Sequence, residues 1–257
     1  MHLEAGDCRF NVAIDGPEGA PWLVLSHALG ATLEMWQPQV RPLSERFRVV
    51  RYDVRGHGGS DVPAGEYSMS QLGTDVLHLL DALGVGRAAY CGLSMGGATG
   101  LWLAAHAPDR FTRYVICSTS PWLGSPETMN SRIETVRREG LRILVDATMQ
   151  RWFTAEFREH SPQLVARTRA EFLATPPAGY AACCAALRDH DEREHLARIE
   201  QRVLIVTGTY DSSPPPTVAR EYAGHIGGAR VVELPAAHLV NCGAAERFNE
   251  AVMGFLE

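Results

Sequence analysis

Residues 91–97 read CGLSMGG, and this short stretch decides the fold. An apolar run at 88–91 precedes it, and helix-forming residues follow it as far as Pro108. A serine with glycines two positions away on either side is typical of a nucleophile on a sharp strand-to-helix turn, because Cβ atoms at those positions would collide with neighbouring backbone. The stretch therefore predicts a strand, a turn that exposes Ser94, and a helix from Met95 to about Ala107.

A serine hydroxyl is a weak nucleophile at neutral pH, so a base has to take its proton and an acid has to orient that base. After a turn of this kind, the expected chain order is serine, then Asp or Glu, then His. Two late segments match this order: the apolar run 203–206 leads into Asp211, and the run 231–234 leads into His238. Both residues would follow the carboxyl end of a strand, and we predict a catalytic triad of Ser94, Asp211 and His238.

Other histidines compete for the role of base, since the chain contains ten of them. His57 lies in a glycine-rich turn that precedes the serine in the chain, which favours a structural loop beside the site. His106 lies on the helix after the serine turn. His190 and His195 lie on the polar side of a helical segment, where exposure is expected. Chain order and placement therefore favour His238.

Backbone N–H groups are expected to stabilise the negative oxygen of the tetrahedral intermediate. The N–H of Met95 would lie at a helix N-terminus, where partial positive charge accumulates. The second donor should come from the loop after an early strand, at residues 26–30. We predict the N–H of Leu29 for this role, with that of Ala28 as the alternative.

Short apolar runs alternate with helical periodicity along much of the chain, which predicts an α/β fold with a mostly parallel sheet covered by helices on both faces. Ser70 is expected to cap a helix whose apolar positions repeat as far as Leu83 and which ends at Gly84. The proline-rich stretch 213–216 predicts a loop that starts another helix. The predicted strands are 22–25, 47–52, 88–91, 114–117, 203–206 and 231–234.

The pattern changes between about Trp122 and Ile199, where strand signals vanish and amphipathic helical stretches take over. Such an insertion predicts a helical cap over the carboxyl ends of the strands, where open α/β sheets bind their ligands. We therefore expect a core of residues 1–121 and 200–257 and a cap of residues 122–199. The predicted cap helices are 133–145, 149–157, 164–173 and 180–187.

Composition argues against several other classes of protein. The chain has 257 residues and a formal net charge of -6, without a basic run that could follow a phosphate backbone, so nucleic acid is not an expected partner. Neither an export signal nor an apolar run of about 20 residues is visible, which favours a cytoplasmic protein without a membrane partner. We expect a small-molecule substrate and leave a homo-oligomer open.

The six cysteines are expected to stay reduced, because a chain of this length buries its own core and lacks an export signal. Cys183 and Cys184 are adjacent and lack the spacing of a zinc or redox site, so both are expected to be buried. The sequence has no H-E-x-x-H motif, no histidine cluster at ligand spacing and no phosphate-binding loop. Neither a metal nor another cofactor is therefore expected.

With these motifs in place, the sequence resembles the α/β-hydrolases from end to end, and within them the 3-oxoadipate enol-lactonases of the β-ketoadipate pathway. The resemblance lies in the segments 25–30 with 35–36, 51–58, 91–97, 151–154, 179–186 with 188–189, and 236–239. The core motifs are shared by the whole superfamily, whereas the cap motifs favour the lactonases. The resemblance implies an α/β-hydrolase fold with an inserted helical cap and a serine enzyme that needs no cofactor.

Enol-lactonases of this kind open a small lactone that bears a free carboxylate, which implies a cationic anchor in the pocket. Arginine suits this role because it can bind a carboxylate through two parallel N–H groups. The cap offers Arg132, Arg151 and Arg188. Trp122 and Trp152 could wall the pocket or fill the core of the cap.

The sequence departs from the family pattern in three places. His27-Ala28 stands where the family commonly has Asn-Ser, residues 214–216 replace a Thr-Pro-Pro run, and Met129 lies near the position of a tryptophan. These positions belong to the oxyanion loop, the neighbourhood of the acid and the cap. The predicted hydrolytic residues stay in place, while the identity of the lactone is left open.

Two other interpretations remain. A carboxylesterase or C–C bond hydrolase would use the same triad, and it would prefer aryl esters or a C–C cleavage substrate to a carboxylated lactone. A ligand receptor on a hydrolase fold would form a stoichiometric adduct without turnover. The intact triad favours an enzyme that works through an acyl-enzyme intermediate.

Overall fold

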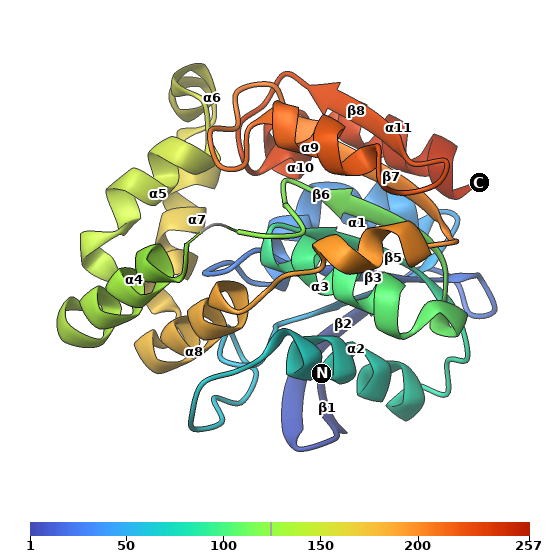
Figure 1. The fold of residues 1–257 in the computed structure, drawn as a ribbon, viewed down its shortest axis with the longest axis horizontal. Helices are drawn as coiled ribbons and strands as arrows, with labels where there is room; N and C mark the ends of the chain where they lie inside the picture. Colours follow the sequence, from blue (N-terminus) through green and yellow to red (C-terminus); the bar gives the residue numbers. More distant parts are fainter. Residues whose placement is uncertain (124) are drawn as a thin grey trace.

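The computed structural model describes residues 1–123 and 125–257, and a single mixed sheet forms its centre (Figure 1). Its strands are β1 (His2–Ala5), β2 (Cys8–Asp15), β3 (Trp22–Ser26), β4 (Arg48–Tyr52), β5 (Ala88–Leu93), β6 (Phe111–Cys117), β7 (Arg202–Gly208) and β8 (Arg230–Leu234). Their order across the sheet is β1-β2-β4-β3-β5-β6-β7-β8. The pairs β1–β2 and β2–β4 are antiparallel, and the pairs from β4 to β8 are parallel.

Helices cover both faces of this sheet, which explains why the strands β5, β6 and β7 are almost continuously buried. Figure 1 shows α2 (Met69–Ala82), α3 (Met95–His106) and α9 (Pro216–Ala223) on the near face. On the far face lie α1 (Gln37–Ser44) and α11 (Ala245–Leu256), and the short α10 (Val240–Gly243) precedes α11. The predicted α/β class, with a mostly parallel sheet between helices, is confirmed.

The N-terminal hairpin of β1 and β2 was not predicted. Residues Cys8, Phe10 and Val12 of β2 are buried, while those between them are more exposed. This alternation is the period of a strand with one buried face, and it is present in the sequence. The hairpin extends the sheet beyond β4 and places its only antiparallel pairs, within the described chain, at that edge.

The start of α2 corrects a second prediction, because Ser68 and not Ser70 caps this helix. The Ser68 hydroxyl accepts the N–H of Gln71 at 3.2 Å, and the Gln71 side chain accepts the N–H of Ser68 at 3.0 Å. This reciprocal pair satisfies two N–H groups that the first helical turn leaves free. The helix ends at Ala82, and Gly84 follows with a φ of +69°.

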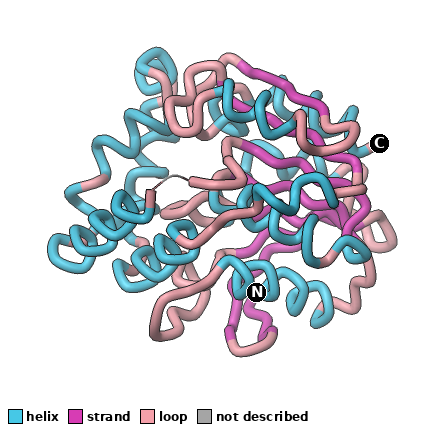
Figure 2. Tube along the Cα trace, in the orientation of Figure 1, coloured by secondary structure: helices cyan, strands magenta, loops and turns pink. Residues whose placement is uncertain are grey.

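Helices make up the segment between β6 and β7, and Figure 2 shows them grouped at one side of the sheet. The first of them ends at Gly140, which has a φ of +71°, so the predicted helix 133–145 is interrupted there. The Thr154 hydroxyl caps a separate short helix, which interrupts the predicted helix 149–157. Gly124 belongs to the expected cap range 122–199 and lies outside the described residues. The cap helices are α4 (Pro126–Glu139), α5 (Val145–Trp152), α6 (Ala155–His160), α7 (Pro162–Ala174) and α8 (Pro177–Arg188).

Two glycines bring the cap and the core into direct backbone contact. A Cβ atom at Gly56, in the loop after β4, would lie 2.7 Å from the Cα of Gly179 in α8. A Cβ atom at Gly179 would lie 2.2 Å from the carbonyl oxygen of Gly56. Contacts this short leave no room for a side chain at either position. The N-terminal turn of α8 is therefore seated on the core loop.

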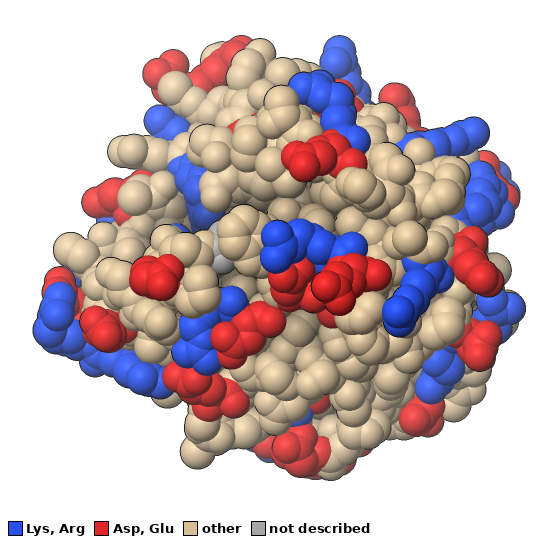
Figure 3. Space-filling view, in the orientation of Figure 1, with Lys and Arg blue, Asp and Glu red and all other residues tan. Residues whose placement is uncertain are grey.

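The charged side chains and the cysteines occupy different parts of the molecule. Acidic and basic side chains are intermixed over the face drawn in Figure 3, so neither sign dominates there. All six cysteines are buried and free. Across the described chain, the helices are too short or too polar to cross a membrane.

Candidate active site

Ser94 lies on the tight turn between β5 and α3. Its backbone has a φ of +59° and a ψ of -111°, a conformation that non-glycine residues rarely adopt. A Cβ atom at Gly92 would lie 2.2 Å from the Gly96 carbonyl oxygen, and one at Gly96 would lie 2.2 Å from the Ser26 carbonyl oxygen. Residues 88–93 and 95–101 are buried, whereas Ser94 is partly exposed. The turn therefore holds Ser94 in a strained backbone conformation that presents its hydroxyl at the carboxyl edge of the sheet.

A chain of hydrogen bonds connects Ser94, His238 and Asp211. His238 Nε2 lies 2.9 Å from Ser94 Oγ, and His238 Nδ1 lies 2.8 Å from Asp211 Oδ2. The N–H of Ser213 donates to Asp211 Oδ1 at 2.9 Å, which fixes the carboxylate. Asp211 follows β7 and His238 follows β8, as the sequence pattern predicts. The structure therefore brings the three predicted residues together in the order serine, imidazole, carboxylate.

The surroundings of His238 favour the neutral imidazole. Burial lowers the pKa of His238, and the Asp211 carboxylate opposes this shift. The charges of Arg151 and Arg132 lower it further. A neutral ring that donates from Nδ1 to Asp211 keeps a lone pair on Nε2 to accept the Ser94 proton.

Two N–H groups near Ser94 lack hydrogen-bond partners. The N–H of Ala28 donates to Met35 Sδ at 3.3 Å, and that of Gly30 donates to His57 Nε2 at 2.9 Å. The N–H groups of Leu29 and Met95 bond to none of the residues that the structure describes. Of the two amides considered for the early loop, Leu29 is therefore the one left free for a ligand.

Two buried histidines, His27 and His57, fix the loop that carries Leu29. His27 Nε2 accepts the N–H of Val54 at 2.8 Å, and the His27 and His57 rings meet at 5.2 Å. Burial, followed by the neighbouring His27, lowers the pKa of His57 to about 3, so its ring stays neutral and its Nε2 can accept from Gly30. The glycine-rich turn around His57 is thus a structural loop beside the site, although the sequence did not reveal its bond to Gly30.

Replacing His57 should damage turnover more than substrate binding. In His57→Phe the Gly30 N–H loses its acceptor, and the loop that carries Leu29 shifts, which should lower kcat by about 10- to 100-fold because small misplacements near a reacting centre are costly. His57→Gln, which keeps an acceptor, should retain most of the activity. Steady-state kinetics of both variants test this expectation, with urea unfolding as a check on stability. Equal loss in both would contradict a role for the hydrogen bond.

Arg132 and Arg151 carry the positive charge beside His238 of the triad. Arg151 lies in the last turn of α5. Its carbonyl accepts the N–H of His238 at 3.4 Å, and the carbonyl of Trp152 accepts the N–H of Leu239 at 3.1 Å. Burial and the nearby Arg132 lower the pKa of Arg151. Neither arginine forms an ion pair with a carboxylate in the described chain. Two partly buried guanidinium groups without an acidic partner are poised for an anionic ligand.

Arg188 does not share this position, which corrects its predicted role as an anchor. Its guanidinium lies 2.7 Å from Asp189 Oδ2 and 3.0 Å from Glu66 Oε2. These two carboxylates already compensate its charge. The sequence pattern did not reveal that Glu66, from a distant part of the chain, reaches Arg188.

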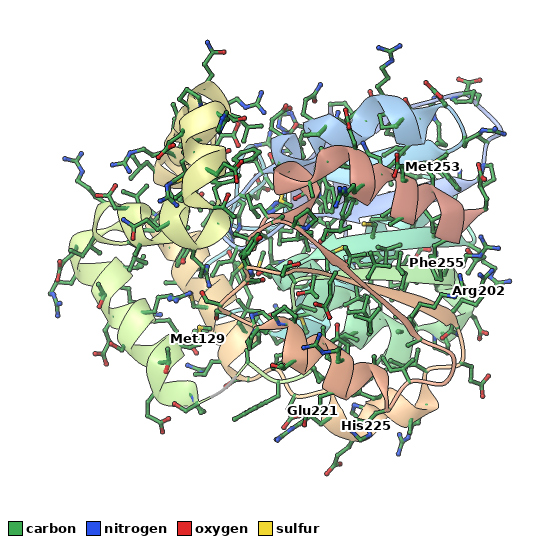
Figure 4. The ribbon with its side chains drawn as sticks, turned by 90° about the horizontal axis from the view of Figure 1, so that it is seen from above. Met129, Arg202, Glu221, His225, Met253 and Phe255 are labelled. Carbon is green, nitrogen blue, oxygen red and sulfur yellow. The ribbon has the colours of Figure 1, made fainter. Side chains whose placement is uncertain are left out.

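The structure places Trp122 and Trp152 in different surroundings. Trp152 is 1% exposed and packs edge-on against Phe172 at 5.8 Å, so it fills the core of the cap, one of its two expected roles. Trp122 is 42% exposed and lies under the Arg193 guanidinium at 4.7 Å. It lines a cavity of 590 Å³ together with Glu221 of α9 and His225, which follows that helix; Figure 4 labels both residues. The triad does not line this cavity, so the role of Trp122 in binding substrate stays a prediction.

His190 corrects one further expectation. The sequence predicts it to be exposed, yet its side chain is 2% exposed, and burial lowers its pKa to about 4. Sequence patterning also overlooked Tyr180 of α8, which is buried beside the two arginines, whose charges act on its pKa. A tyrosine in an apolar helix gives no signal that separates a core residue from one that faces a ligand.

The chain belongs to the α/β-hydrolase family, since the family model described as alpha/beta hydrolase fold matches residues 21–243. It is a hydrolase. Over 252 residues it is 39% identical to 3-oxoadipate enol-lactonase 2 of Acinetobacter baylyi, covering 97% of this chain and 94% of that protein. The solved enol-lactonase from Burkholderia xenovorans matches it with a TM-score of 0.98 and 44% identity, covering 100% of this chain and 99% of the other.

A more distant relative bears a different name. The putative carbamate hydrolase RutD of Caulobacter segnis is 30% identical over 247 residues, covering 93% of this chain and 92% of that protein. The predicted resemblance to enol-lactonases is confirmed by the two more similar proteins, and the expected α/β-hydrolase fold is confirmed with it.

Proposed function

We propose that this carboxylic ester hydrolase opens a small carboxylated enol-lactone, 3-oxoadipate enol-lactone, to give 3-oxoadipate. The observation that carries the proposal is the pair of arginines, Arg132 and Arg151, beside the hydrogen-bonded chain of Ser94, His238 and Asp211. An ester-cleaving serine needs no positive charge to attack a neutral ester. A pair of uncompensated cations suits a substrate that carries its own carboxylate.

In the proposed reaction, Ser94 Oγ attacks the lactone carbonyl carbon while His238 Nε2 takes the hydroxyl proton. The N–H groups of Leu29 and Met95 hold the negative oxygen of the tetrahedral intermediate, and Asp211 stabilises the imidazolium. The carbon–oxygen bond of the ring then breaks, and His238 returns the proton to the departing enol oxygen. The product of this half-reaction is an acyl-enzyme whose enol tautomerises to a ketone.

Water completes the reaction by the same groups in reverse roles. His238 takes a proton from a water molecule, whose oxygen attacks the acyl carbon, and the same two N–H groups hold the negative oxygen again. The bond to Ser94 Oγ breaks, and His238 returns the proton to that oxygen. The released acid carries the new carboxylate and the one already bound by the arginines.

The substrate assignment is tested by comparing kcat/KM for the enol-lactone, a neutral aryl ester, a carbamate and a C–C cleavage substrate. Charge-assisted hydrogen bonds from the two arginines should favour the carboxylated lactone over the aryl ester by about 100-fold or more, since each such bond contributes about 1.5 to 3 kcal/mol. A higher kcat/KM for the carbamate, aryl ester or C–C substrate would overturn the assignment. A stoichiometric adduct without turnover would instead indicate a receptor.

A further inference from the structure

A cluster of two histidines and one glutamate lies outside the site described above. His106 ends α3, while Glu192 and His195 lie in the segment that leaves the cap, which contains the 3-10 helix η4 (Arg193–Arg198). His195 Nδ1 is 2.7 Å from Glu192 Oε2, and His106 Nδ1 is 3.9 Å from the same oxygen. One potential ligand atom of each residue lies within 4.8 Å of the other two. We propose that this cluster binds a divalent transition-metal ion of the zinc type.

Glu192 is a buried carboxylate whose negative charge favours a nearby cation. Its side chain is 7% exposed, and the ion-pair partners that it has among the described residues are the imidazoles of His106 and His195. An imidazole lacks the permanent positive charge of a guanidinium, so it compensates a buried carboxylate less completely. A metal ion at this carboxylate supplies the missing charge.

His106 is held in place before any ion arrives. Its ring stacks on Trp102 with centroids 4.7 Å apart and an angle of 10° between the planes. Its Nδ1 lies 2.9 Å from the Trp102 carbonyl oxygen and donates to it. This bond occupies Nδ1, the ring nitrogen that lies 3.9 Å from Glu192 Oε2, so His106 would bind an ion through its Nε2, as metal-binding histidines with a carbonyl-bonded ring N–H commonly do.

The chemistry of the donors selects the class of ion. Imidazole nitrogen suits zinc, copper and nickel, whereas calcium and magnesium prefer oxygen ligands alone. Bonds of about 2.0 to 2.2 Å to zinc place tetrahedral ligand atoms about 3.3 Å apart. His195 Nδ1 lies closer than this to Glu192 Oε2, at 2.7 Å, so it has to move outward, and its 33% exposure leaves room for that rotation. Three protein ligands leave a fourth position to water.

Metal binding would join two parts of the chain that are far apart in sequence. The helix α3 begins directly after Ser94, and Glu192 and His195 follow the last cap helix. The N–H of Glu192 also donates to the Pro121 carbonyl at 2.8 Å, at the entry to the cap. A bound ion would therefore fasten the exit of the cap to the far end of the serine helix and stabilise the folded chain.

The test measures zinc binding to metal-free protein by calorimetry and by thermal unfolding. We expect one ion per chain and a rise in Tm of about 5 to 10 °C at a free zinc concentration one hundred times Kd, with little effect of magnesium. His195→Gln and Glu192→Gln should each abolish most of this rise. The matched control is His160→Gln, because His160 also bonds to a carbonyl one turn earlier, at Glu156, but lies outside the cluster.

Two outcomes would overturn the proposal. One is the absence of saturable zinc binding by the folded wild-type protein. The other is binding that survives in His195→Gln and Glu192→Gln, which would place the ion elsewhere, for example at His238. Repeating the titration in His238→Gln separates the two sites, because this substitution removes the imidazole beside Ser94 and leaves the cluster intact. The unfolding curves without zinc show whether each variant is folded.

Discussion

Ser94→Ala is expected to lower kcat for the enol-lactone by about 10⁴- to 10⁶-fold, the largest effect of any single substitution in this chain. The variant keeps the free N–H groups of Leu29 and Met95, so a residual acceleration over water should remain. It removes the oxygen that forms the acyl-enzyme in the proposed mechanism. Alanine also fits the strained turn no worse than serine, so the fold should persist.

Two measurements separate this chemical loss from damage to the fold. Mass spectrometry after treatment with a fluorophosphonate should show one adduct on the wild-type protein and none on Ser94→Ala. Ser70→Ala, on the exposed side of α2, serves as the control and should keep full activity. Wild-type turnover by Ser94→Ala would disprove the serine mechanism.

Replacing either cap arginine should cost about 30- to 1,000-fold in kcat/KM for the carboxylated lactone, because a charged hydrogen bond to a partly buried ligand carboxylate is lost. Arg132→Met and Arg151→Met keep much of the side-chain volume and remove the charge together with its N–H donors. A neutral aryl ester should react at nearly the wild-type rate. The ratio of the two substrates therefore reports the anchor itself.

The pH of this comparison matters because both arginines lower the pKa of His238. Removing one of them raises that pKa, which increases the protonated and inactive fraction of His238 at acidic pH. Assays at about pH 8 avoid this effect, since an unperturbed histidine titrates near 6.5. Arg188→Met is the matched control, as Glu66 and Asp189 already pair with that residue. An equal loss on both substrates would show that the arginines support the fold and not the substrate.

The parts of this molecule that could be predicted from sequence depend on local rules. The turn around Ser94 follows from the steric demands of its glycines, and Asp211 and His238 follow from their positions after parallel strands. Local patterning also gave the helical character of the cap. The pattern could not distinguish one long helix from two short ones at Gly140, because the apolar residues keep their helical spacing on both sides of this glycine.

The features that could not be predicted depend on contacts between residues that are far apart in the sequence. Arg132 and Arg188 look alike as cationic residues of cap helices, and only the fold shows that Glu66 reaches Arg188 and that no described carboxylate reaches Arg132. The cluster of His106 with His195 was missed for the same reason, since its members are separated by most of the cap. Ligand spacing along the sequence detects a metal site only when its members share one local element.

The contact between Gly56 and Gly179 makes the junction of cap and core sensitive to size alone. Main-chain atoms meet there, so any side chain at either position would push the first turn of α8 away from the core loop. The main-chain bonds that His238 and Leu239 donate to α5 hold the cap at a second place. The placement of the cap arginines beside His238 therefore depends in part on two residues that have no side chain.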